Sequence, residues 1–233
     1  MPIRPEKTAI VLLSGGLDST TALYKALKCG YEVWPVSFSY GQKAEYQERA
    51  ASFATIRDLQ RAGARVANVL RIRLDGDNLF DGSSILRNGP PLGASVGFVG
   101  TANAPQRNTL MIAAAFAIAE SNKLASVWVG CTQQSSYGLP YPDSSIRFLR
   151  RLASVLNQGS AAAAQSPKGA IRLVAPYARK TKVDVVLDAV RLGVPIKNTY
   201  SCYLGDKKPC GECGACLDRQ TAFSLAKVLD TAI

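Results

Sequence analysis

The most constraining feature of this sequence is a glycine-containing turn, residues 14–19 (SGGLDS), which joins an apolar run to a helical segment. The apolar run, residues 8–13 (TAIVLL), has the length and continuity of a strand buried on both faces, which is typical of a parallel sheet. Glycines let a backbone approach an anion closely, and the N–H groups and dipole at a helix start attract negative charge. The pattern therefore predicts an α/β fold with an anion site at this strand-to-helix turn.

The same alternation of apolar runs and helical segments continues along the chain. This order predicts a single domain, residues 1–233, built on a doubly wound, Rossmann-like parallel sheet. Further strands are expected at residues 32–40, 64–74, 125–130 and 171–177, and helices at residues 17–30, 42–63, 107–122, 143–159, 180–193 and 217–233.

The segments between these strands and helices allow further predictions. Residues 75–107 are rich in Gly, Pro, Asn and Ser, and a loop of this length in a compact domain is usually functional or mobile. Residues 159–169 (GSAAAAQSPKG) have the composition of a poorly ordered linker or loop. Asp143 or Ser144 is expected to cap the helix that follows it.

The chain carries a formal charge of +11 and contains no histidine. Its basic residues are scattered, which indicates either an ordinary basic surface or an anionic partner such as a nucleotide, a nucleic acid or an acidic protein. The missing histidine excludes Ser-His-Asp triads and His-ligated metals. No apolar run reaches about 18 residues and no cleavage site follows the first apolar stretch, so we expect a cytoplasmic protein without membrane spans.

Four cysteines cluster in the pattern C-x7-C-x2-C-x2-C: Cys202, Cys210, Cys213 and Cys216. Four thiolates suit tetrahedral Zn²⁺ with no open position, so a structural zinc site is predicted within residues 200–220. An iron–sulfur cluster is the main alternative, ahead of a redox dithiol. Cys29 and Cys131 are expected to be buried structural residues, although Cys131 could line a site at the end of its strand.

Asp18 is unusual in a phosphate-binding turn, because a carboxylate repels phosphate unless a cation lies between them; it could be a Mg²⁺ ligand or a helix cap. The turn is not a Walker A loop. It resembles the SGG-x-DS pyrophosphate loop of the PP-loop ATP pyrophosphatases, which cleave ATP to AMP and pyrophosphate and transfer AMP to a substrate oxygen. This resemblance implies ATP as co-substrate, Mg²⁺, and an ATP site formed by Ser14, Gly15, Gly16, Leu17, Asp18, Ser19, Thr20, Ser37 and Phe38.

Further segments resemble, in the same order, the motifs of one branch of that superfamily, the QueC (7-cyano-7-deazaguanine synthase) family. They are Phe38–Gln42 (FSYGQ) with Glu45 or Glu48 after it, Arg107-Asn108, Tyr141–Asp143 (YPD), Thr181-Lys182, and the run from Ser201 through the cysteines to Arg219 and Phe223. The resemblance implies conversion of 7-carboxy-7-deazaguanine to the nitrile with ATP and ammonia. An acyl-adenylate and an amide are the implied intermediates, a second adenylation of the amide oxygen allows dehydration, and a homodimer is implied as well.

The resemblance also implies roles for individual residues. Asp18, Lys182 and Arg107 are the predicted catalytic residues: the two cations neutralise phosphate charge and Asp18 holds Mg²⁺. Either cation could instead be an ordinary surface residue. The predicted contacts to the deazaguanine are Tyr40, Gln42, Asn108, Tyr141 and Asp143, and Asp143 has the alternative role of a helix cap.

The sequence departs from the family pattern at the acceptor end of this site. Lys43-Ala44 stand where a histidine is usual, residues 131–136 (CTQQSS) lack the usual Asp, and Ser144-Ser145 replace a Cys-Arg pair. These changes suit a paralogue that keeps adenylation and changes the acceptor, such as a QueC-like antiphage enzyme that joins the deazaguanine carboxylate to an amine of an acceptor protein. A tRNA-modifying PP-loop enzyme and a non-catalytic nucleotide-binding module are further alternatives. No RNA-binding extension is visible, so a nucleic-acid partner is not expected.

Overall fold

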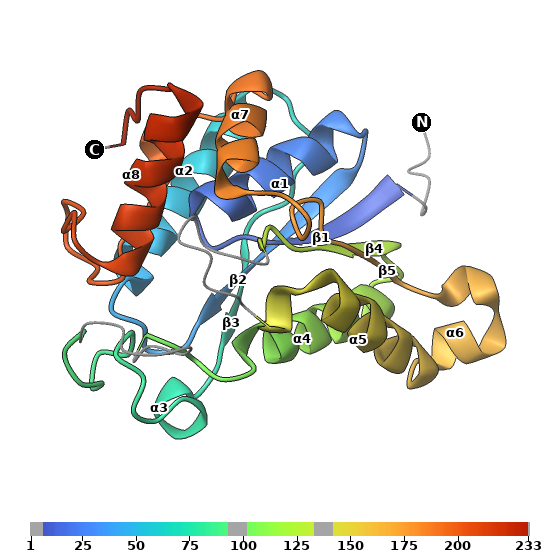
Figure 1. The fold of residues 1–233 in the computed structure, drawn as a ribbon. Coiled ribbons are helices and arrows are strands. Elements are labelled where there is room, and N and C mark those ends of the chain that lie inside the picture. The colour runs from blue at the N-terminus through green and yellow to red at the C-terminus, as the bar shows by residue number, and fades with distance from the viewer. Residues whose placement is uncertain (1–6, 93–101, 133–141, 233) are drawn as a thin grey trace.

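The computed structural model describes residues 7–92, 102–132 and 142–232. Within them, five parallel strands form one sheet in the order β3-β2-β1-β4-β5 (Figure 1). The predicted doubly wound parallel sheet is therefore confirmed. The strands are β1 (Thr8–Leu12), β2 (Glu32–Ser39), β3 (Leu70–Arg73), β4 (Ser126–Trp128) and β5 (Arg172–Val174).

Helices cover both faces of this sheet (Figure 1). On one face lie α1 (Leu17–Lys28) and α2 (Glu45–Arg61), and on the other lie α4 (Arg107–Ser121) and α5 (Ile146–Gln158). A further pair, α7 (Lys182–Arg191) and α8 (Gly214–Ala226), packs together, and α7 also packs on α1. Two short helices, α3 (Gly76–Leu79) and α6 (Ala161–Gln165), lie in the connections.

The residues of β1 explain why this strand is apolar at successive positions. Ile10 packs into the cluster on the α4 side, whereas Ala9 and Val11 pack into the cluster on the α1 side, and all three are 0% exposed. Because successive residues of a strand point to opposite faces, a strand covered on both sides needs apolar residues at every position. Residues 8–13 meet that requirement at the centre of the sheet.

The strand order creates a crevice at the carboxyl edge of the sheet. The chain moves outward from β1 to β3 on one side and then returns to build β4 and β5 on the other side of β1. Ligands of open α/β sheets bind where the strand order reverses in this way. The segment after β4 approaches the first turn of α1 closely in this crevice. A Cβ added to Gly130 would lie 2.4 Å from the carbonyl oxygen of Asp18.

Two expectations about the segment around α5 are wrong. The cap of α5 is Ser145, whose Oγ accepts a hydrogen bond from the N–H of Phe148, because residues 142–144 form a separate 3₁₀ turn first. Residues 159–169 are not an unstructured linker. Ser160 caps α6 and Ser166 caps a second 3₁₀ turn, so local side-chain capping orders this segment.

Two further expectations fail near other helix ends. The last helix stops at Ala226 instead of continuing to residue 233, and Lys227 takes a left-handed conformation with φ of 54° that ends it. Cys29, expected to be buried, is exposed just after the end of α1.

Among the residues that the structure describes, none of the helices combines the length and apolar character needed to cross a bilayer.

Candidate active site

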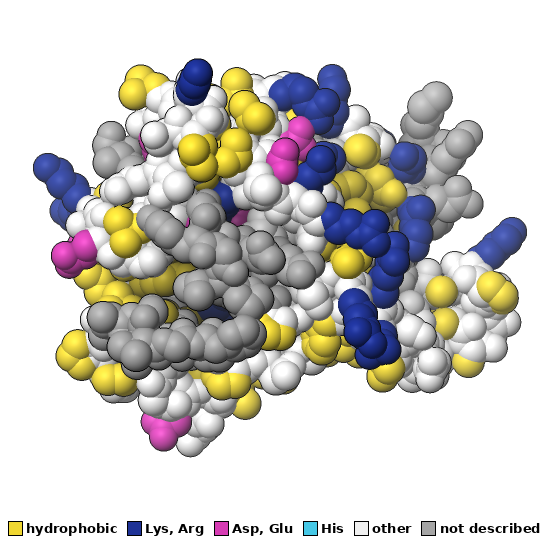
Figure 2. Space-filling view, in the orientation of Figure 1, with side chains coloured by type: hydrophobic (Ala, Val, Ile, Leu, Met, Phe, Trp, Pro, Cys, Tyr) yellow, Lys and Arg dark blue, Asp and Glu magenta, His cyan; other side chains and the backbone are white. Residues whose placement is uncertain are grey.

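A cavity of about 330 Å³ opens at the carboxyl edge of the sheet, a size typical of small-molecule sites. Its walls come from the turn after β1, the end of β2, the starts of α2, α4 and α7, and the cysteine segment. Basic side chains gather on the face shown in Figure 2, in a band from the end of α1 past β5 to α5.

The turn between β1 and α1 presents helix N–H groups to this cavity. The helix begins at Leu17 with Gly16 as its N-cap, and no side chain caps it. Ser14 and Ser19 hold the turn closed, since their Oγ atoms lie 3.0 Å apart and Ser19 Oγ donates to Gly16 O. The first N–H groups of a helix have no intrahelical partner, so an uncapped start leaves them available to an anion.

Asp18 pairs with Lys182 across the cavity. Asp18 lies in the first turn of α1 and is not its cap, so the capping alternative is wrong. Its Oδ2 accepts from Lys182 Nζ at 2.7 Å, while its Oδ1 is buried without a hydrogen-bond partner among the described residues. A buried, unpartnered carboxylate oxygen is a position where a cation would be stabilised. Asp18 and its orphaned oxygen therefore fit the predicted Mg²⁺ contact.

The position of Lys182 follows from a capping box. Thr181 caps α7: its Oγ1 accepts from the N–H of Asp184, and the Asp184 carboxylate accepts from the N–H of Thr181. These bonds fix the start of α7, and Lys182 is its first residue. The side chain of Lys182 is 12% exposed, so it is not an ordinary surface lysine.

Arg107 stands at the start of α4 and reaches the end of β2. Its Nη1 donates to the hydroxyl of Tyr40 at 3.1 Å, and the guanidinium carbon lies 5.8 Å from the centre of the Tyr40 ring. Interaction with Tyr40 raises the pKa of Arg107 above its ordinary value, so the guanidinium stays charged. Burial raises the pKa of Tyr40, which keeps this phenol neutral. The cavity thus contains two cations, Lys182 and Arg107, from different elements.

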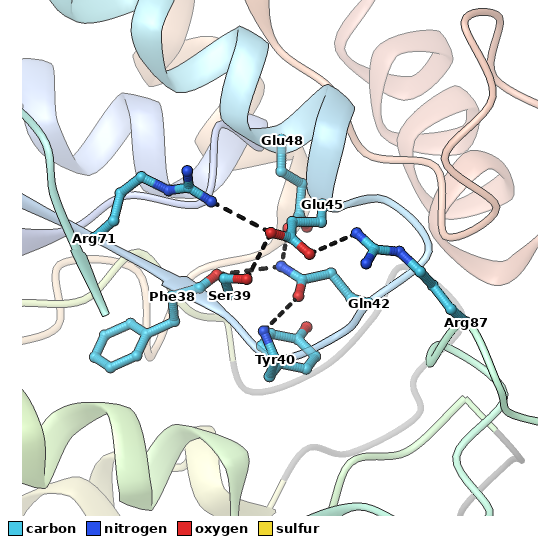
Figure 3. Close-up of polar contacts among 8 residues, drawn as sticks. All are labelled: Phe38, Ser39, Tyr40, Gln42, Glu45, Glu48, Arg71 and Arg87. Atoms are coloured by element: carbon cyan, nitrogen blue, oxygen red, sulfur yellow. Dashed lines mark hydrogen bonds and ion pairs between the residues drawn. The ribbon is translucent and has the colours of Figure 1, made fainter. Parts of the chain in front are cut away.

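Gln42 and Glu48 form a polar cluster beside Tyr40 (Figure 3). The Gln42 side chain accepts from the N–H of Tyr40 at 2.8 Å and donates to Phe38 O at 3.2 Å and to Glu48 Oε2 at 2.9 Å. Both amide hydrogens of Gln42 are therefore used inside the protein. The sequence pattern noted Glu48 without assigning it a role, and the structure places it in the cavity wall.

Asp143 has a different capping role from the one expected. Its Oδ2 accepts from the backbone N–H of Asn108, in the first turn of α4, at 3.3 Å. The Asn108 side chain donates to Ser144 Oγ at 3.0 Å. Asp143 therefore supports the start of α4 and with it the position of Arg107.

Most of the predicted site residues meet in this cavity. It is lined by Ser14, Gly16, Leu17, Asp18, Ser19, Phe38, Tyr40, Gln42, Arg107, Asn108 and Lys182. The predicted residues Gly15, Thr20, Ser37 and Asp143 are not among those lining it, and Tyr141 lies outside the described residues. Ser37 alternates with Val36 and Phe38 along β2, and these two neighbours face the cavity instead.

Cys131 also lines the cavity, next to Gly130 in the segment just after β4. Burial raises the pKa of its thiol to about 12. The thiolate is the nucleophilic form, so the thiol is poorly suited to nucleophilic catalysis.

The cysteine cluster forms a compact set of four sulfurs. The Sγ atoms of Cys202, Cys210, Cys213 and Cys216 lie within 4.8 Å of one another, with closest approaches of 3.5, 3.9 and 4.0 Å. Tetrahedral zinc with ordinary Zn–S bonds requires sulfur separations of about 3.8 Å. Burial raises the pKa of the Cys213 and Cys216 thiols, so their thiolate forms need a cation nearby. These residues could hold a metal ion, and the spacing fits zinc.

The parallel sheet, the glycine-containing turn after its central strand and the cysteine segment define an α/β protein of the PP-loop type. The family described as queuosine biosynthesis protein QueC matches residues 8–227. The chain belongs to this family.

Curated relatives agree with this assignment. The chain is 33% identical over 223 residues to a 7-cyano-7-deazaguanine synthase of a Nitratiruptor species, covering 95% of this chain and 96% of that protein. A protein of the same name from Microcystis aeruginosa is 34% identical over 225 residues, covering 93% of this chain and 91% of that protein.

A solved 4-thiouridine synthetase–RNA complex with bound ATP is similar in fold, with a TM-score of 0.54 and 16% identity. The match covers 94% of this chain and 53% of that one, so the present chain spans about half its length.

Proposed function

We propose that this protein adenylates the carboxylate of a 7-deazaguanine with ATP and passes the activated acyl group to an amine. The observation that carries the proposal is the uncapped start of α1 facing the Asp18–Lys182 pair in one cavity. Helix N–H groups suit the pyrophosphate part of ATP, and a lysine ammonium suits charge that develops on the α-phosphate. The relatives named 7-cyano-7-deazaguanine synthase supply the substrate class.

The role of each residue follows from its position in the cavity. Backbone N–H groups of residues 17–19 bind the leaving pyrophosphate, and Asp18 Oδ1 would hold Mg²⁺, which supplies additional positive charge at the phosphates when bound. Lys182 stabilises negative charge while the substrate carboxylate attacks the α-phosphate. Arg107, oriented by Tyr40, neutralises anionic oxygens on the opposite wall. The four cysteines would hold zinc as a structural ion outside the reaction.

With ammonia as the amine, the first product is an amide, and a second adenylation leads to 7-cyano-7-deazaguanine. An amine of an acceptor protein is a second candidate, favoured by the departures at the acceptor end. Lys43, in the place of the usual histidine, donates to Ser84 O at 2.8 Å and to Pro90 O at 3.3 Å. The Lys43 ammonium is therefore bound by backbone carbonyls of residues 84 and 90. It is not a free side chain that could take over the role of the histidine imidazole.

The experiment is ATP-dependent pyrophosphate release with and without 7-carboxy-7-deazaguanine, followed by mass spectrometry of the products. Carboxylate-dependent release supports adenylation, and the product mass separates nitrile, free amide and protein conjugate. Release that is independent of the carboxylate, or formation of ADP, would contradict the proposal.

A further inference from the structure

We infer that Glu48 forms a binding site for the protonated amine and accepts its proton before the amine attacks the acyl group. This inference rests on the proposed function and assigns the amine-activation step to a residue of this chain. The chain contains no histidine, so a carboxylate in the cavity is a chemically reasonable base for this step.

The backbone places Glu48 directly beside the phosphate-binding turn. A Cβ added to Gly15 would lie 2.5 Å from Glu48 O, so the turn before α1 and the first turn of α2 are in close contact there. The side chain of Glu48 lines the same cavity as Asp18 and Lys182. An amine held by Glu48 would therefore share a cavity with the activated acyl group.

The carboxylate of Glu48 is not neutralised by a direct ion pair. Its hydrogen bond comes from the neutral amide of Gln42, and within the described residues no ion pair joins it to Lys or Arg. Gln42 is itself fixed by Phe38 O and Tyr40 N, so its N–H group is aimed at Glu48 (Figure 3). A partly buried carboxylate with only a neutral donor attracts a small cation such as ammonium.

Glu45, one turn earlier on α2, shows the contrast. Its carboxylate accepts from Ser39 Oγ at 2.6 Å and pairs with Arg71 at 3.3 Å and Arg87 at 2.6 Å. It does not line the cavity. The two carboxylates on α2 therefore have different environments. Glu45 is neutralised by two arginines, whereas Glu48 accepts a hydrogen bond from a neutral amide and lines the cavity.

The charges around Glu48 agree with a proton-accepting role. Burial raises the pKa of Glu48, opposed by the Gln42 hydrogen bond and by Arg107 and assisted by Glu45. Tyr40, which also lines the cavity, has a raised pKa and stays neutral. A general base works best when its pKa lies near the operating pH, and the direction of this shift brings Glu48 closer to it.

The chemical step balances with ammonium as the amine. Ammonium gives one proton to Glu48, and the lone pair of the resulting ammonia forms a C–N bond to the acyl carbon. The C–O bond to AMP breaks, and its electron pair leaves on AMP. The nitrogen loses a second proton to water, and Glu48 releases the first, leaving amide, AMP and two protons.

The test compares Glu48→Gln with the wild type, using ammonium and hydroxylamine as acceptors near neutral pH. Hydroxylamine is already neutral there and needs no base before it attacks. In Glu48→Gln we expect ammonium-dependent amide formation to fall about a hundredfold, while hydroxamate formation and carboxylate-dependent ATP–pyrophosphate exchange persist. Raising the pH should partly restore the ammonium reaction by supplying free ammonia. Glu45→Gln is the control and should leave the ratio of the two acceptor rates unchanged.

Equal loss with both acceptors, an undiminished ammonium rate, or a wild type that exchanges pyrophosphate but makes no amide from ammonium would overturn the inference while leaving adenylation intact. A Glu48→Gln protein that does not fold is recognised by lost exchange, and Glu48→Ala then serves as the second variant, judged by the same ratio. A wild type without carboxylate-dependent exchange would overturn the proposed function itself, and this inference with it.

Discussion

The backbone N–H of Tyr200 donates to the carbonyl oxygen of Gly15 at 2.9 Å. This bond joins the segment that leads into the cysteine cluster to the turn between β1 and α1, although the two lie far apart in the sequence. Tyr200 also packs against the cluster, and its hydroxyl donates to Asp206 O at 2.8 Å. The cysteine segment therefore supports the turn directly as well as contributing Ser201 and Tyr203 to the cavity wall.

Metal removal should consequently weaken nucleotide binding. A structural zinc contributes on the order of 10 kcal/mol to local folding, so its loss should release residues 200–216 and the Tyr200–Gly15 bond. We expect a strong chelator, or the substitution Cys216→Ser, to lower the Tm and to weaken ATP binding about tenfold or more. Calorimetry measures both effects, and elemental analysis of the same samples measures the metal content. Stoichiometric zinc should restore both after chelation, and ATP affinity that is unchanged after verified metal loss would contradict the coupling.

Gly15→Ala should destabilise the protein far more than Gly30→Ala. Both glycines have positive φ, +84° and +82°, so each alanine has a similar backbone cost of about 1–2 kcal/mol. A Cβ at Gly15 would also clash with Glu48 O, whereas nothing lies within 4 Å of one at Gly30. Urea unfolding should show an extra loss of about 1–3 kcal/mol for Gly15→Ala, from overpacking. Equal losses would show that the two turns do not differ in this way.

Lys182→Met should reduce adenylation about a hundredfold or more, because it removes a cation from the reacting phosphates. Lys25→Met is the matched control. Lys25 pairs with Asp188 at 2.6 Å between the same two helices, α1 and α7, but does not line the cavity. It should lower stability without a comparable loss of pyrophosphate release. Similar kinetic losses in the two variants would indicate a purely structural role for Lys182.

The stability of the protein should depend on the ionisation of Glu48. Burial raises its folded-state pKa above the ordinary 4.5, so this group stabilises the fold when protonated, and that contribution is lost as the pH rises through the folded-state pKa. Glu48→Gln should therefore gain stability relative to the wild type as the pH rises above 4.5. Denaturant unfolding at several pH values measures the difference, and a gain confined to acidic pH would reverse the sign and refute the environment described for Glu48.

The sequence predicts the architecture correctly where the local pattern of apolar residues matches the burial seen in the fold. The continuous apolar run of β1 and the glycine-containing turn after it suffice to predict a buried parallel strand and a helix start. The helix ends were harder, because the cap of α5 depends on whether residues 142–144 form a separate 3₁₀ turn, and the sequence offers three adjacent capping residues there. Short-range capping alternatives of this kind differ by about 1 kcal/mol.

The sequence indicated many of the residues that line the cavity, but not the contacts between them. Asp18 and Lys182 are 164 positions apart, and only the folded chain shows that they form an ion pair. The contrast between Glu45 and Glu48 depends on Arg71 and Arg87, which come from β3 and the connection after it. Gln42 was predicted to contact the substrate, but its amide hydrogens are used by Phe38 O and Glu48, which sequence spacing could not indicate.

The most direct test of the central claim follows the oxygen of the carboxylate. When 7-carboxy-7-deazaguanine labelled with ¹⁸O in its carboxylate reacts with ATP and an amine, the account predicts one labelled oxygen in the AMP, because that oxygen attacks the α-phosphate and leaves with AMP. Unlabelled AMP, or label in inorganic phosphate together with ADP, would contradict adenylation of the substrate in this cavity.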